Sequence, residues 1–314
     1  MKKRVLHIDE NHPALLRGLE ELGFENILAY SASLPEIQET LKNCQGLILR
    51  SRIPVDSELL THAPALEFIG RVGSGLENID LKEAEALNIS VFAAPEGNRN
   101  AVGEHALGML LGLLNKLPAG QASIAQGKWL REEHRGWELS SRTVGIIGYG
   151  HAGKSFAKNL SGFNCRVFCY DIKPQLGDTF AEQVSMEHIF ENCDVISFHL
   201  PQDSSTRYFC DASFIQKMKN SFWLLNTSRG SVVNTQALVA GLNHQKIKGA
   251  GLDVLEFESA SFASIGGGNR PPELDYLVTH PQVSLSPHVA GWTFESHERL
   301  AQTIVQKIKT HYKL

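Results

Sequence analysis

The chain has 314 residues, which at roughly 150 residues per domain predicts about two domains and excludes a peptide, a fibre or a small disulfide-stapled protein. Hydrophobic residues make up 42% and charged residues 20%, a globular composition that excludes a disordered chain. Thirty Lys and Arg against 34 Asp and Glu leave a net charge of −4, so we expect neither nucleic acid nor a membrane as partner. An anionic ligand must therefore be held by local groups.

The N-terminus and the cysteines indicate a cytoplasmic protein. The apolar run after the basic N-terminus stops at Asp9, too early for a signal peptide, and no run of 18 apolar residues predicts a membrane-spanning helix. Five scattered cysteines contain no CxxC pair and predict neither a disulfide framework nor a zinc site, so no metal is expected.

Short apolar runs alternate with amphipathic stretches along the chain, which is typical of parallel sheets covered by helices on both faces. In a first block we predict strands at 5–8, 46–50, 67–72 and 90–94. A helix with Leu15 and Leu19 on its buried face follows the cap candidate Asn11 and stops at Gly23. In a second block we predict strands at 143–148, 166–171, 194–200, 221–226 and 249–255. The fold class is therefore α/β, with two doubly wound parallel-sheet domains.

Two further helices are predicted outside these blocks. Residues 100–117 form an apolar stretch of about five turns, which we expect to be buried at a domain or subunit boundary. Near the C-terminus, Leu300, Ile304 and Ile308 have the spacing of an amphipathic helix.

The strongest local signal is the segment GIIGYGHAG, whose Gly148, Gly150 and Gly153 form a G-x-G-x-x-G turn between a predicted strand and a helix. Such glycines permit a tight turn, close approach of a pyrophosphate and close helix packing. Asp171 ends the next predicted strand, where a carboxylate binds the ribose hydroxyls of a dinucleotide. The alternative is an ordinary tight turn with a solvated Asp.

Three polar residues follow apolar strands of the second block: Arg229, Glu258 and His288. In an open α/β sheet, ligands gather at the carboxyl ends of the strands, so these residues are predicted to meet in one crevice. Each of them alone also has an ordinary structural explanation. Together they would supply a cation, an acid and a proton carrier.

The ordered motifs RVGSG, GYGHAG, HLP, NTSRG, LDVLEFE and SPHVAG closely resemble the D-isomer-specific 2-hydroxyacid dehydrogenase family, over nearly the whole chain. The resemblance implies an NAD-dependent oxidoreductase. It further implies a Rossmann NAD-binding domain at 98–285, inserted into a flavodoxin-like substrate domain formed by 1–97 and 286–314. The terminal helix would thus return to the first domain.

The resemblance also implies the roles of individual residues. Arg229 would bind the substrate carboxylate, His288 would be the acid/base, and Glu258 would be its carboxylate partner. Ser74 and Gly75 would bind the substrate through their backbone amides. The implied NAD-binding residues are Gly148, Gly150, His151, Ala152, Gly153, Asp171, His199, Thr227 and Asp253.

The sequence departs from the family pattern in three places. Glu258 is followed by Ser259 instead of the proline that is frequent in the family. The segment 259–277 is longer than usual, and its glycine-rich part would either fold over the cleft or lie on the surface. His151 stands where the family often has Arg, so one pyrophosphate contact is expected to be weaker.

Within the family, LILRSR followed by GRVGSGLENID most resembles the 3-phosphoglycerate dehydrogenases, which implies that Arg50 and Arg71 bind a phosphate. The alternative is that these arginines pair with acids such as Glu67 or Glu77, and Arg52 is a weaker candidate for the phosphate. The favoured substrate is 3-phosphoglycerate, oxidised to 3-phosphohydroxypyruvate in serine biosynthesis. Erythronate 4-phosphate, glyoxylate, hydroxypyruvate and lactate stay open.

Three expectations concern the domain content, the class and the assembly of the protein. The chain stops at Leu314, which leaves no room for a serine-sensing domain. An NAD(H)-sensing protein like the C-terminal-binding corepressors is the alternative of a different class. The apolar stretch 100–117, together with Trp129 and Trp137 after it, predicts a homodimer, an interface that the family resemblance also implies.

Overall fold

The computed structural model describes residues 2–258 and 271–314, which form two compact units. The first unit contains residues 2–98 and 292–314, and the second contains residues 99–258 and 271–291. The second unit is therefore inserted into the first. Of the predicted glycine-rich segment, residues 259–270 lie outside the described residues.

The second domain boundary lies at 291/292 instead of 285/286, so His288 belongs to the second unit. Backbone hydrogen bonds explain the difference. The N–H of Ser286 donates to the carbonyl of Leu252 (3.1 Å), and the N–H of His288 donates to the carbonyl of Asp253 (2.8 Å). These bonds tie the segment after the last strand to the sheet of the second unit.

The first unit contains a parallel five-stranded sheet with the order β2-β1-β3-β4-β5, the flavodoxin-like order that the resemblance implies. Its strands are β1 (Arg4–His7), β2 (Glu25–Leu28), β3 (Gly46–Leu49), β4 (Phe68–Arg71) and β5 (Ser90–Phe92). The prediction missed β2. This edge strand has no fully buried residue, and its sequence ENIL has no continuous apolar run.

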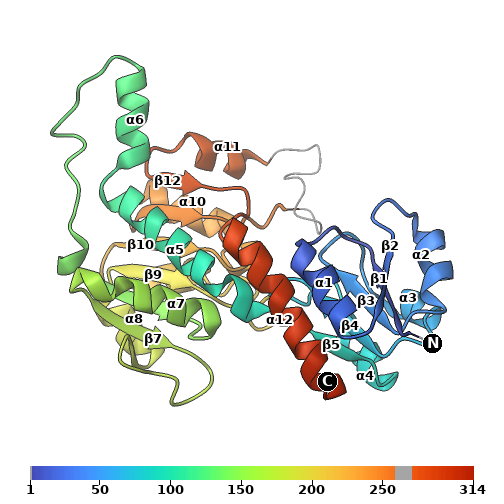
Figure 1. Ribbon diagram of the computed structural model, residues 1–314. Helices are drawn as coiled ribbons and strands as arrows, with labels where there is room; N and C mark the ends of the chain where they lie inside the picture. Colours follow the sequence, from blue (N-terminus) through green and yellow to red (C-terminus); the bar gives the residue numbers. More distant parts are fainter. Residues whose placement is uncertain (1, 259–270) are drawn as a thin grey trace. The chain divides into compact units, whose positions relative to one another are not determined.

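Helices cover both faces of this sheet (Figure 1). On one face, α1 (Pro13–Glu21) and α12 (Phe294–Tyr312) pack through Leu15, Leu19, Leu300 and Ile304. On the other face lie α2 (Leu34–Leu41), α3 (Ser57–Thr61) and α4 (Leu81–Ala86). The predicted cap Asn11 is wrong. Its side chain donates to the carbonyl of Asp9, and His12 caps α1 by accepting from the N–H of Ala14 (3.2 Å).

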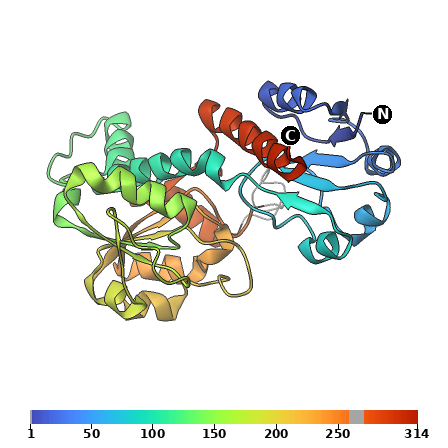
Figure 2. The ribbon, with the colours of Figure 1, turned by 60° about the horizontal axis from the view of Figure 1, so that its bottom comes forward.

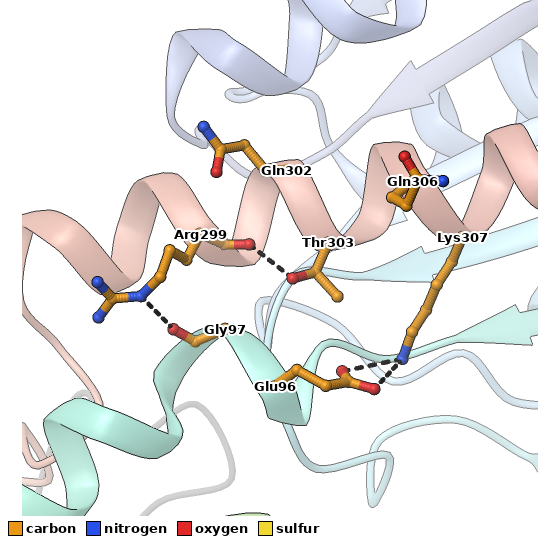
Figure 3. A pocket seen from close by; sticks show the side chains of 7 residues that line it. All are labelled: Glu96, Gly97, Arg299, Gln302, Thr303, Gln306 and Lys307. Carbon is orange, nitrogen blue, oxygen red and sulfur yellow. Dashed lines mark hydrogen bonds and ion pairs between the residues drawn. The ribbon is translucent and has the colours of Figure 1, made fainter.

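The C-terminal helix α12 is fixed to the start of α5 (Pro95–Leu114) by polar contacts (Figure 3). Lys307 Nζ donates to both carboxylate oxygens of Glu96 at 3.0 Å, and Arg299 Nε donates to the carbonyl of Gly97 at 3.1 Å. A Cβ at Gly97 would lie 2.8 Å from Leu300 Cα, so the backbones approach closely there. The groove along these contacts has a volume of about 440 Å³.

The second unit contains a parallel seven-stranded sheet with the order β12-β11-β10-β9-β6-β7-β8. The strands are β6 (Thr143–Ile147), β7 (Arg166–Tyr170), β8 (Glu182–Gln183), β9 (Val195–Phe198), β10 (Phe222–Asn226), β11 (Ile247–Leu252) and β12 (Val283–Leu285). The strand order reverses between β6 and β9, which defines the topological switch point of a Rossmann sheet. The short edge strand β8 was not predicted, because two residues carry no periodic signal. The strand β12 is the one expected before His288, for which no bounds were predicted.

Helices also cover both faces of this sheet (Figure 2). One face is covered by α5 and α7 (His151–Leu160), and the other by α8 (Met186–Asn192), α9 (Ala212–Lys217), α10 (Thr235–Asn243) and α11 (Pro272–Thr279). The helix α6 (Leu117–Ala125) follows α5. Short 3₁₀ turns are η1 (Leu139–Ser141), η2 (Ser161–Phe163) and η3 (Gly230–Val232). In the described part of the chain, no helix is both long and apolar enough to cross a membrane.

The apolar stretch predicted as a helix at 100–117 is helical from Pro95 to Leu114 as α5. Lys116 has a left-handed φ of 51° and separates α5 from α6. Leu110 and Leu114 are completely buried in the core of the second unit. Much of the apolar surface of α5 is therefore covered within the chain itself.

Candidate active site

The turn between β6 and α7 is tightly packed at two of its glycines and open at the third. Gly148 has a φ of +91°, and a Cβ there would collide with the carbonyl oxygen of His199. A Cβ at Gly153 would collide with the carbonyl oxygen of Gly148, whereas a Cβ at Gly150 would meet nothing within 4 Å. Gly148 and Gly153 thus shape the turn, and Gly150 leaves room for a ligand against the backbone.

The first turn of α7 is suited to an anion. The helix begins at His151, and its N-cap residue Gly150 has no side chain to accept from the first N–H groups. Unsatisfied N–H groups and the helix dipole both favour a phosphate at this position. His151, Ala152 and Gly153 are the first residues of the helix, so their backbones lie where the sequence predicts the pyrophosphate contacts.

Asp171 follows β7 directly, and its carboxylate is oriented by two backbone groups. Oδ2 accepts from the N–H of Tyr149 at 2.8 Å, and Oδ1 accepts from the N–H of Lys173 at 2.9 Å. The first of these bonds joins the carboxylate to the glycine turn. The structure therefore places Asp171 beside the turn, as a ribose-binding carboxylate requires.

His199 and Thr227 follow neighbouring strands. The ring of His199 faces inward: Nε2 lies 2.9 Å from Ser197 Oγ, the ring packs against Phe156, and burial lowers its pKa to about 4. Its backbone carbonyl is the part that meets the glycine turn. Thr227 is buried, and its Oγ1 has no hydrogen-bond partner in the described chain, so this hydroxyl is unsatisfied within the protein itself.

His288 and Glu258 form a close pair. His288 Nδ1 lies 2.6 Å from Glu258 Oε2, and the side chains are 22% and 16% exposed. A carboxylate only accepts hydrogen bonds, so Nδ1 carries the hydrogen and Nε2 is the basic nitrogen of the neutral ring. The other oxygen of Glu258 accepts from the N–H of Leu255 at 2.5 Å, which fixes the carboxylate.

Arg229 lies in the loop after β10, against the loop that holds Glu258. A Cβ at the next residue, Gly230, would collide with the backbone of Leu255, so the two loops touch at this glycine. Asn226 Nδ2 donates to the carbonyl of Arg229 (2.9 Å), and the guanidinium of Arg229 donates to the carbonyl of Ser228 (2.7 Å). These contacts place the Arg229 loop beside the Glu258 loop at one edge of the sheet.

Asp253 has partners that the sequence did not predict. Its Oδ1 accepts from Ser286 Oγ (2.6 Å) and the N–H of Val289 (2.8 Å), and Oδ2 accepts from the N–H of Ala290 (2.8 Å). The carboxylate therefore binds the loop that carries His288. Its predicted contact with the nicotinamide stays a prediction.

The predicted substrate residues of the first unit follow β3 and β4. Arg50 stacks on Trp292, with the guanidinium carbon 3.9 Å from the ring centroid, and in the described chain its guanidinium forms no ion pair with a carboxylate. Arg71 folds back over Gly73, where a Cβ would collide with the guanidinium. The alternative partner Glu67 instead binds Lys3 and Tyr312, each at 2.5 Å.

Two further features of this unit concern the substrate. The Ser74 hydroxyl donates to Asn98 Oδ1 at 2.6 Å, and the N–H groups of Ser74 and Gly75 bond to no acceptor among the described residues. Arg52 is structural: its guanidinium donates to the carbonyls of Ile8 (2.9 Å) and Tyr30 (2.7 Å). Arg52 is the weaker phosphate candidate of the sequence, and these contacts use its guanidinium within the chain.

Comparison with known protein families identifies the family to which this chain belongs. Residues 107–290 match the model for the D-isomer specific 2-hydroxyacid dehydrogenase NAD-binding domain. The chain belongs to the D-isomer specific 2-hydroxyacid dehydrogenase family. The predicted family and the predicted cofactor, NAD, are confirmed.

Relatives of this dehydrogenase family differ in substrate. The chain is 31% identical to D-3-phosphoglycerate dehydrogenase of Rattus norvegicus over 305 residues, covering 96% of this chain and 55% of the relative. It is 29% identical to hydroxypyruvate reductase of Thermotoga maritima, covering 96% and 94%. The structure of D-lactate dehydrogenase from Aquifex aeolicus complexed with NAD and lactic acid superposes with a TM-score of 0.84, at 26% identity over 99% and 96%. The chain thus spans about half the length of the mammalian relatives it matches.

Each unit also contains residues beside the predicted ones that the sequence did not indicate. Trp292 stacks on Arg50, and Ser286 and His105 adjoin Asp253. Trp292 lies four residues after His288 in the sequence, a spacing that gives no sign of contact with a strand some 240 positions earlier. His105 lies in the middle of an apolar helix, where a lone histidine carries no signal by itself.

Proposed function

We propose that this chain is an NAD-dependent dehydrogenase that interconverts a D-2-hydroxy acid and its 2-oxo acid. The observation that carries the proposal is the 2.6 Å hydrogen bond between His288 Nδ1 and Glu258 Oε2, beside the Arg229 loop. It supports His288 as the acid/base, Glu258 as its orienting carboxylate and Arg229 as the cation for the substrate carboxylate.

In this proposal, His288, Glu258 and Arg229 each have a separate role in the reaction. Bound NAD supplies the acceptor for a hydride from C2 of the hydroxy acid. During oxidation, His288 Nε2 takes the proton of the C2 hydroxyl, and during reduction it returns the proton to the same oxygen. Glu258 holds the ring in the required tautomer and stabilises the imidazolium. Arg229 binds the carboxylate in two places at once and so fixes which face of C2 is presented.

The finer part of the proposal is that the substrate carries a phosphate, as 3-phosphoglycerate does. Arg50 supports it, because its guanidinium lies over the Trp292 ring and forms no ion pair with a carboxylate in the described chain, so its N–H groups can bind a phosphate. The relatives named phosphoglycerate dehydrogenase also support it. The relative named hydroxypyruvate reductase, of which the chain covers 94%, supports the unphosphorylated alternative.

The test compares two substrates that differ only in the phosphate: 3-phosphohydroxypyruvate and hydroxypyruvate. Arg50→Ala and Arg71→Ala should each raise KM for the phosphorylated acid by about 10- to 100-fold, since a charge-assisted contact contributes about 1.5–3 kcal/mol. KM for hydroxypyruvate should change little, because Arg229 and the amides of Ser74 and Gly75 still hold its carboxylate. Arg17→Ala, which removes an exposed charge on α1, is the matched control.

Two results would contradict parts of the proposal. If the wild type prefers hydroxypyruvate, or if both substrates suffer equally in the variants, the phosphate assignment is wrong and a hydroxypyruvate or glyoxylate reductase takes its place. If the protein binds NADH but no 2-oxo acid oxidises it, the NAD(H)-sensing alternative is favoured.

A further inference from the structure

The loop that carries His288 is held by one buried carboxylate. Asp253 follows β11 and is 2% exposed. Three donors from residues 286–290 converge on its two oxygens: the hydroxyl of Ser286 and the N–H groups of Val289 and Ala290, all within 2.8 Å. The carbonyl of Asp253 also accepts from the N–H of His288. The backbone on both sides of His288 is therefore attached to one residue.

This attachment matters because His288 has an unfavourable backbone conformation. Its φ is +55°, in the left-handed region that residues other than glycine rarely adopt. Such a conformation persists only where neighbouring contacts hold it. The contacts with Asp253 supply that hold, and they set the direction in which the imidazole leaves the backbone toward Glu258.

His105 on α5 completes the network from the other side. Its Nε2 lies 2.9 Å from Ser286 Oγ and 3.6 Å from Asp253 Oδ1. The single hydroxyl hydrogen of Ser286 is donated to Asp253, so Ser286 Oγ must accept from His105. Nε2 of His105 therefore carries the hydrogen, and the hydrogen bonds run in one direction, from His105 to Ser286 to Asp253.

We infer that His105 is a positioning residue for the acid/base His288, acting through Ser286 and Asp253. The inference rests on the proposed function, because its effect on kcat can be measured only if the chain has that activity. Its physical content is independent of that function: removal of the His105 donor loosens Ser286 and the Asp253 carboxylate, and with them the loop 286–290.

The test compares His105→Gln with His105→Ala. The side-chain nitrogen of Gln lies where Nε2 of His lies, so His105→Gln keeps a donor for Ser286, whereas His105→Ala removes it. We expect His105→Ala and Ser286→Ala to lower kcat about 10-fold, with KM for the 2-oxo acid changed less than about twofold, as for a misplaced catalytic group. His105→Gln should recover most of kcat. His288→Ala gives the lower limit of activity, and His244→Ala, at an exposed position, is the control.

A second readout does not depend on turnover. Amide hydrogen exchange of Val289 and Ala290 reports directly on their bonds to Asp253. Exchange should be faster in His105→Ala and Ser286→Ala and close to wild type in His105→Gln. Unchanged exchange in His105→Ala overturns the inference, as does an equal kcat loss in the Ala and Gln variants. If the exchange pattern holds but no acid is turned over, the proposed function fails and the positioning role stands.

Discussion

At the scale of single residues, we expect Asp171 to decide which nicotinamide cofactor is used. Its carboxylate is fixed by the N–H groups of Tyr149 and Lys173, next to the glycine turn. A 2′-phosphate would lie beside this fixed negative charge, and repulsion in a partly desolvated crevice costs several kcal/mol. We therefore predict a kcat/KM for NADH that exceeds that for NADPH by about 100-fold or more.

The measurement is steady-state kinetics with both cofactors for the wild type and for Asp171→Ala. The variant should lose most of the preference through better use of NADPH and weaker use of NADH. The exposed side chain of Lys173, two residues further on, is the group that would attract a 2′-phosphate. Equal efficiency of the wild type with both cofactors would contradict the assignment.

The residue scale also shows how far a sequence predicts a site. The predicted strand ends placed Arg229, Glu258 and His288 at one edge of the sheet, because the carboxyl ends of parallel strands lie at the same edge. Side-chain direction is not contained in that information. The ring of His199 packs inward, and the carboxylate of Asp253 binds the chain's own loop. Both facts depend on contacts between segments that are far apart in the sequence.

At the scale of elements, the β6–α7 turn separates the requirements of folding from those of binding. A side chain at Gly153 would collide with the carbonyl of Gly148, whereas one at Gly150 would meet only open space. We predict that Gly153→Ala destabilises the protein by about 2–4 kcal/mol, as expected where a buried contact must shift. For Gly150→Ala, the free energy of unfolding should stay within about 1 kcal/mol of the wild-type value. This variant should bind NADH at least several-fold more weakly, because its methyl group occupies the space left for the pyrophosphate.

Urea unfolding and NADH fluorescence titration on the same preparations distinguish the two glycines. The prediction fails if Gly150→Ala binds NADH as the wild type does, or if the two variants are equally stable.

The elements themselves were predicted to different degrees. The buried strands and α12 were found because several apolar residues repeat at the period of a strand or a helix. The edge strands β2 and β8 were missed because each is short and partly exposed. The cap of α1 was placed one residue early, because Asn is a common cap whereas His12 caps by a local contact of its ring.

At the scale of the whole molecule, the insertion of one unit into the other is the feature that local patterns could not reveal. Residues 292–314 return to the first unit because the apolar face of α12 completes its core through Leu300, Ile304 and Ile308. Amphipathic spacing predicts that this helix is buried on one face. It does not state which of two sheets covers that face.

The structure also changes the basis of the predicted homodimer. Much of α5 is buried in its own unit, and Trp137 packs edge-on against Trp223 at 5.1 Å, which leaves it 36% exposed. More strongly exposed apolar side chains of this region lie on α6, which has no buried residue, and in the loop after it. Ile124 is 57% exposed and Trp129 is 78% exposed.

A helix of nine residues with no buried residue is marginal in water, so α6 needs a partner, and a second copy of the chain is the occupant we predict. Ile124→Asp combined with Trp129→Asp should convert the wild-type dimer to a monomer at micromolar concentration, because charges in a desolvated apolar interface cost several kcal/mol. Val278→Asp, at a 51% exposed apolar position on α11, should leave the dimer intact. Sedimentation velocity of the three proteins at equal concentration makes the comparison. A monomeric wild type would show that α6 is not a self-association surface, and a variant that stays dimeric would place the interface on another part of the chain.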